Sequence, residues 1–99
     1  MFEVDFTGAP RQHPGGSWWF VAVPCELSDE IRSLTAGHRR GFGSLRVEVA
    51  TGATTWRTSI FPDAARGTFL LPVRRAVREA EDLEDGRAHT FRLRLIDVG

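Results

Sequence analysis

The single cysteine is the strongest nucleophile in this sequence. Cys25 lies between a predicted strand and a predicted helix, where backbone N–H groups can lower the pKa of a thiol. A working thiolate also needs a general base within hydrogen-bond reach, and no spacing links His38 or His89 to Cys25. We therefore expect Cys25 to be a small, partly buried and unreactive side chain.

A second set of polar residues lies on the predicted strand at residues 54–61. Arg57 and Ser59 share the face opposite Trp56. They line a pocket in one strand register and face solvent in the other, and we favour solvent. Together with Trp56 and Trp19, they are the candidate ligand-binding residues. The histidines occur in separate segments without a paired ligand motif, so we predict no metal site, no cofactor and no catalytic set.

Every basic residue of this chain is arginine, whose planar fork suits carboxylates and phosphates. The formal net charge is +0, which removes the bulk electrostatic argument for nucleic-acid or membrane binding. The local candidates for nucleic-acid contact are Arg39 and Arg40 in a glycine-rich loop, and Arg75 on the second helix. The segment 40–47 resembles an RNA-recognition octamer, but Ser44 and Val47 stand where aromatic rings are needed. We interpret it as a loop that enters a strand.

The apolar pattern predicts a mostly β protein of the α+β class. Alternation indicates strands at residues 2–7, 45–49, 54–61 and 90–98, and apolar runs that end in proline indicate strands at residues 17–24 and 68–72. Helices are expected from Ser28, a good N-cap, and from Val73, which follows Pro72. Trp56 and Phe91 are the predicted core aromatics, because both sit in runs whose other face is polar.

A strand that ends in proline, then a helix, then a strand occurs twice. We interpret this as two ββαβ halves that cannot bury their apolar faces separately, so residues 1–99 are expected to form one domain. A closed six-stranded barrel with two short capping helices removes the exposed sheet edges. A ferredoxin-like sandwich is the alternative if two of the six predicted segments are not strands in the folded protein.

The lone cysteine excludes an internal disulfide and fits a reducing compartment. No apolar run approaches the ~20 residues of a membrane span, and the acidic, alternating N-terminus is unlike a signal peptide. We therefore expect a cytoplasmic location and no membrane contact.

A set of segments occurs in a fixed order along the chain: Gly16-x-Trp18-x-Phe20-Val21-x-Val23-Pro24, Ile31, Trp56-Arg57-Thr58-Ser59-Ile60-Phe61-Pro62, Gly67-Thr68-x-Leu70-Leu71-Pro72-Val73 and Arg78. Together these segments resemble DUF1905, a small bacterial family of unknown function. The resemblance covers most of the chain from Gly16 onward, and it departs from the family pattern at Thr51-Gly52 and at Gly86-Arg87. It implies a double-split β-barrel, the fold of AbrB/MazE-type DNA-binding regulators, whose Pro-x-x-hydrophobic-Arg stretch is similar to residues 71–78.

These observations favour a non-enzymatic binding module for a small molecule or a protein. Nucleic-acid binding is the second hypothesis, carried by the implied fold, but a neutral chain that holds both barrel halves is expected to bind DNA weakly. An enzyme that uses Cys25, or Arg57 with Ser59, ranks last. Fold kinship alone does not establish function.

Overall fold

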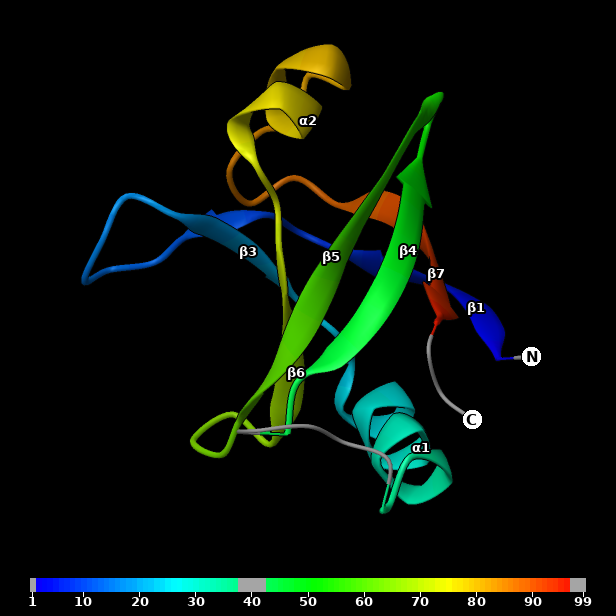
Figure 1. Cartoon of the computed structure of the whole chain (residues 1–99). Helices are drawn as coiled ribbons and strands as arrows, with labels where there is room; N and C mark the ends of the chain where they lie inside the picture. Colours follow the sequence, from blue (N-terminus) through cyan, green and yellow to red (C-terminus); the bar gives the residue numbers. More distant parts are fainter. Residues whose placement is uncertain (1, 38–42, 97–99) are drawn as a thin grey trace.

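The computed structural model describes residues 2–37 and 43–96 (Figure 1). Within these residues the chain forms seven strands and two helices. In chain order they are β1 (Glu3–Gly8), β2 (Arg11–Gln12), β3 (Trp19–Ala22), α1 (Cys25–Leu34), β4 (Leu45–Thr51), β5 (Thr54–Asp63), β6 (Thr68–Pro72), α2 (Arg75–Ala80) and β7 (His89–Leu95).

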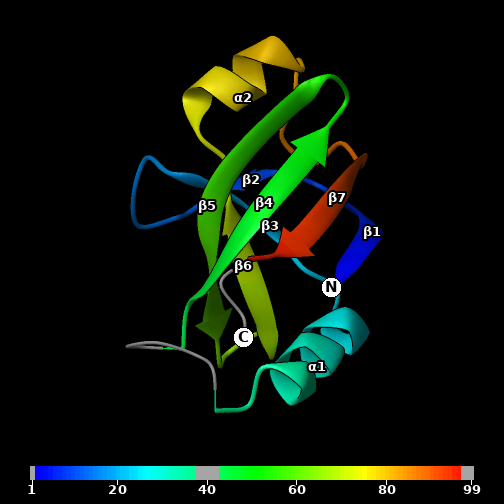
Figure 2. The same ribbon diagram turned by 45° about the vertical axis from the view of Figure 1, so that its right-hand side comes forward.

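The strands form one antiparallel sheet in the order β1-β7-β4-β5-β6-β3-β2, which curls into a half-barrel (Figures 1 and 2). The long strand β5 holds the two parts of the sheet together. It pairs with β4 from Thr54 to Ile60, and its last residues pair with β6 from Phe61 to Asp63. A strand that serves two neighbours along different parts of its length lets the sheet bend strongly there.

The expectation of a closed six-stranded barrel is wrong. Among the described residues, edge strand β1 pairs with β7 and edge strand β2 pairs with β3, and no ladder joins the two edges. Ala9 and Pro10 connect these edge strands along the chain. Proline has no N–H for a ladder, and β2 is only two residues long, so lateral closure does not form. The ferredoxin-like alternative is also wrong. It requires that two of the six predicted strands are not strands, and all six are present in the structure.

The first helix begins earlier than the sequence predicts. It starts at Cys25, directly after Pro24, so Ser28 lies inside the helix rather than at its N-cap. The Ser28 hydroxyl instead donates to the carbonyl of Val23 at 3.1 Å and accepts from the N–H of Phe69 at 3.0 Å. A serine selected for a tertiary contact has the same sequence signature as a capping serine.

The side chains that point inward form one apolar cluster that includes residues from both ends of the sheet. Trp56 and Phe91 belong to it, which confirms their prediction as core residues. The two helices lie at opposite ends of the curled sheet (Figure 1) and contribute Ile31 from α1 and Val77 from α2. The core therefore fixes both helices relative to the strands between them.

None of the helices in the described part of the chain is long and apolar enough to cross a membrane. The internal duplication stays a prediction. Among the described residues the two halves differ, because the first half has the additional strand β2.

Candidate functional site

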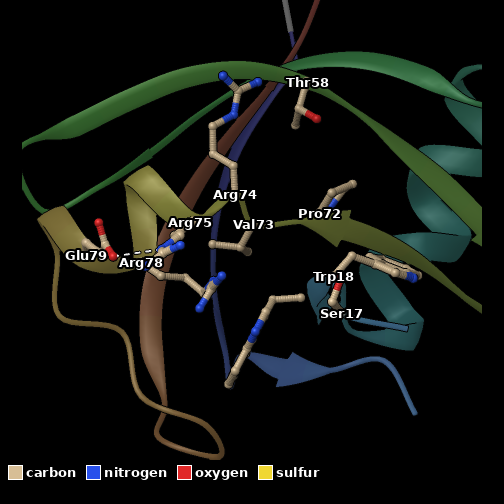
Figure 3. A pocket seen from close by; sticks show the side chains of 10 residues that line it. Ser17, Trp18, Thr58, Pro72, Val73, Arg74, Arg75, Arg78 and Glu79 are labelled. Carbon is tan, nitrogen blue, oxygen red and sulfur yellow. Dashed lines mark hydrogen bonds and ion pairs between the residues drawn. The ribbon is translucent and has the colours of Figure 1, made fainter. Parts of the chain in front are cut away.

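A groove of about 840 Å³ opens where β5 and β6 separate (Figure 3). The ladder between these strands extends from Asp63 to Phe61, and β6 then continues beside β3. Strand β5, the end of β6, the first turns of α2 and the start of β3 surround the opening. Its walls are formed by Ser17, Trp18, Trp19, Thr58, Pro72, Val73, Arg74, Arg75, Arg78 and Glu79.

A cation–aromatic pair forms part of the groove wall. The guanidinium carbon of Arg78 lies 4.6 Å from the centroid of the Trp19 ring, a distance at which the ring attracts a cation. The N–H of Val73 donates to the carbonyl of Trp19 at 2.9 Å, which fixes β3 against the chain that enters α2. The Nε of Arg78 is buried and has no acceptor among the described residues. Packing on the ring, rather than a carboxylate, therefore positions this cation.

Two more arginines stand at the groove, and they extend differently. Arg74 reaches towards β5, beside Thr58 (Figure 3), and its Nη2 donates to the carbonyl of Arg57 at 3.4 Å. Arg75 pairs with Glu79 at 2.9 Å, as the i,i+4 spacing predicts, and both side chains are exposed. Three arginines and one carboxylate, that of Glu79, are among the residues that line the groove. The groove wall therefore carries a net positive charge.

The indole of Trp18 is held in place at the outer end of the groove. It stacks on the ring of His13, with the centroids 4.8 Å apart and the planes at 19°. The N–H of His13 also donates to the carbonyl of Trp18 at 2.9 Å. Even so, Trp18 remains 41% exposed. An exposed aromatic face that the fold already orients loses little conformational freedom when a ligand covers it.

Guanidinium groups, indole faces and the hydroxyls of Ser17 and Thr58 therefore line one concave surface. Such groups bind anionic oxygens and planar or apolar ligand atoms. Groups of this kind, gathered on one wall, suit the binding of a negatively charged molecule.

Comparison with protein families gives a match over residues 6–93 to the family described as Domain of unknown function (DUF1905). The chain belongs to the DUF1905 family. Comparison with curated proteins gave no match. The matched range of this DUF1905 protein contains every residue of the groove, from Ser17 to Glu79.

The structure does not bring the four predicted ligand-binding residues of the DUF1905 protein together. Trp19 lines the groove. Trp56 is 7% exposed and lies in the core. Arg57 is exposed on the face of β5 opposite Trp56. Ser59 shares that face with Arg57 and lies opposite Arg46 in the β4–β5 ladder. The register thus places Arg57 away from the groove, as favoured from the sequence.

Arg57 takes part in a surface ion-pair network instead. Its Nε lies 3.1 Å from Glu48, which also accepts from Arg94 at 2.7 Å. The hydrogen bond from Arg94, followed by that from Arg57, holds the pKa of the Glu48 carboxyl below its ordinary value. This network explains Arg57 without a ligand.

Of the predicted nucleic-acid contacts, Arg75 lies at the groove, whereas Arg39 and Arg40 lie outside the described residues. Sequence reasoning did not select Arg78, Trp18 or Arg74 as candidate site residues. The available signal was the recurrence of arginine at positions 74 and 78, one helical turn apart, directly after a strand that ends in proline.

Cys25 is exposed, so the expectation that it is partly buried is wrong. It occupies the first position of α1, and its Sγ lies 3.9 Å from the carbonyl of Arg66. We now expect a thiol reagent to label native Cys25 nearly as fast as it labels the urea-unfolded chain. Cys25→Ser should change the free energy of unfolding by less than about 0.5 kcal/mol, as for other surface substitutions. Strong protection of the thiol in the native protein would show that the residue is buried.

Proposed function

We propose that this DUF1905 protein is a binding module for a small anionic molecule that carries a carboxylate or a phosphate. The observation that carries the proposal is Arg78, whose guanidinium lies on Trp19 in the groove wall. The Nε of this fork is buried, but the side chain as a whole is only half-buried, so an anionic ligand oxygen in the groove would pair with its outer N–H groups. Arginine also keeps its charge at all pH values where proteins fold, so the cation is always present.

The shape of the groove supports a small ligand. Its volume of about 840 Å³ falls in the range of small-molecule sites, roughly 300–1,000 Å³. Arg74 and Arg78 extend towards β5 and β3 respectively, and both forks border the same opening. Two forks on opposite sides of one opening favour an anion held between them.

The three tryptophans make a direct test possible. In a titration of the ¹⁵N-labelled protein with inorganic phosphate and with benzoate, we expect the indole N–H signals of Trp18 and Trp19 to shift. The signal of Trp56 should stay in place, because Trp56 lies in the core and outside the groove wall. Shifts of all three signals together, or of none at accessible concentrations, would contradict the proposal.

A charge-matched pair of variants locates the site. Arg78→Met keeps an unbranched side chain over Trp19 but removes the fork, and it should weaken anion binding about tenfold or more, the value of a charge-assisted hydrogen bond. Arg87→Met removes one charge at an exposed position paired with Glu84 and should leave the affinity unchanged. Equal losses in both variants would indicate long-range attraction rather than a site.

The same proposal includes a fold assignment. The apolar cluster that the described residues share supports treating residues 1–99 as one domain of the double-split barrel type, related to AbrB/MazE-type regulators. Duplex and single-stranded DNA therefore form the comparison arm of the titration, at physiological salt. We expect weak or absent binding, because the net charge is +0 and specific DNA binding uses several phosphate contacts.

A further inference from the structure

An apolar pocket adjoins the groove. It has a volume of about 580 Å³, and Trp18 and Pro72 belong to the walls of both spaces. Phe61, Leu70 and Ala65 are among the residues that complete the pocket wall. A ligand seated in the groove can therefore continue past Trp18 without leaving the surface of the protein.

Exposed aromatic area is concentrated at this pocket. Phe61 is 45% exposed and Trp18 is 41% exposed. Nearby strand residues such as Ile60 and Phe20 are buried instead. The third large apolar side chain exposed among the described residues is Leu34, on α1. Exposed apolar area that gathers beside polar groups is typical of a ligand-binding surface.

The acidic residue in the pocket wall does not oppose an apolar ligand. Asp63 accepts from the guanidinium of Arg66 and from the backbone N–H of Ala65 at 3.0 Å. These bonds hold the carboxylate within the turn that follows β5, and the hydrogen bond from Arg66 lowers its pKa. Asp63 is thus satisfied by its own turn and offers no charge that a ligand must neutralise.

We propose that the ligand is an amphiphilic carboxylate, with its head on the arginines of the groove and an alkyl or aryl tail that crosses Trp18 into the Phe61 pocket. This inference rests on the proposed anion-binding function and specifies the ligand class. The cationic groove and the apolar pocket have complementary chemistry, and two shared wall residues make them continuous.

A homologous series of carboxylates tests the tail. Acetate, butanoate, hexanoate and octanoate are titrated into the ¹⁵N-labelled protein below their micelle concentrations, with the Trp18 and Trp19 indole signals as the readout. We expect the affinity to rise about three- to fourfold for each methylene that enters the pocket. 1-Octanol, which lacks the anionic head, should bind at least tenfold more weakly than octanoate, the value of a charge-assisted hydrogen bond.

Two matched variants locate the tail. Phe61→Ser should remove the gain with chain length while leaving the acetate affinity unchanged. Leu34→Ser replaces an apolar side chain on α1 that is 54% exposed and should leave both the gain with chain length and the acetate affinity unchanged. If Leu34→Ser matches Phe61→Ser, the tails adsorb nonspecifically and the inference is overturned. Circular dichroism spectra that match the parent protein establish that each variant is folded.

The two proposals fail differently. If acetate and phosphate shift the groove indoles but longer tails bring no gain, the amphiphilic ligand is overturned and the anion site stands. If no carboxylate and no phosphate shifts these signals, both are overturned. Equal affinities of octanol and octanoate would also overturn the inference, because the head would then contribute nothing.

Discussion

Replacement of Trp56 by alanine should lower the free energy of unfolding by about 3–5 kcal/mol, the range for emptying a buried aromatic site. Trp56 is 7% exposed, packs in the central apolar cluster and lies opposite Val49 in the β4–β5 ladder. The loss combines the transfer free energy of the ring with the cavity that it leaves. Urea unfolding followed by far-ultraviolet circular dichroism measures it without relying on tryptophan fluorescence.

Two further substitutions separate burial from side-chain identity. Trp18→Ala removes the same ring from a surface position that is 41% exposed, and it should cost less than about 1.5 kcal/mol, mostly the lost stacking on His13. Trp56→Phe keeps an aromatic ring and removes an indole N–H that is buried without an acceptor among the described residues. It should therefore cost far less than Trp56→Ala. Similar losses in Trp18→Ala and Trp56→Ala would contradict the assignment of the core.

The central strands could be read from the sequence because local patterns decide them. The alternation around Trp56 and the run from Thr68 to Pro72 correspond to β5 and β6. Strand β2 could not be read, because two residues between prolines and glycines carry no periodicity. The open edge of the half-barrel could not be read either, because it depends on how the chain passes Pro10 between two edge strands.

The candidate site was less predictable, because it depends on contacts between distant segments. Trp19 was identified as a residue type able to bind ligands, but its pairing with Arg78 requires that β3 lie beside β6 and that α2 follow β6 directly. A basic residue on a short helix looks solvated until that neighbour is known. Arg57 showed the reverse case, since its apparent availability disappears once Glu48 lies on the adjacent strand.

The second large effect on stability is expected at Ser28. Its hydroxyl is fully buried and joins α1 to strand β6 and to the residue that follows β3. It donates to the carbonyl of Val23 and accepts from the N–H of Phe69. Ser28→Ala removes both bonds and leaves the buried Phe69 N–H without this acceptor. We expect a loss of about 1–3 kcal/mol in the free energy of unfolding, which is the penalty for an unsatisfied buried donor.

Ser33→Ala is the matched control for this substitution, because Ser33 lies on the same helix with an exposed side chain. Alanine favours helix more than serine does, so this variant should be neutral or slightly stabilised. Amide hydrogen exchange adds a local readout: protection of the Phe69 N–H should fall in Ser28→Ala and stay unchanged in Ser33→Ala. If both variants unfold at the same urea concentration, Ser28 contributes only as a helical residue. A loss confined to Ser28→Ala would instead show that this hydroxyl docks α1 onto the sheet.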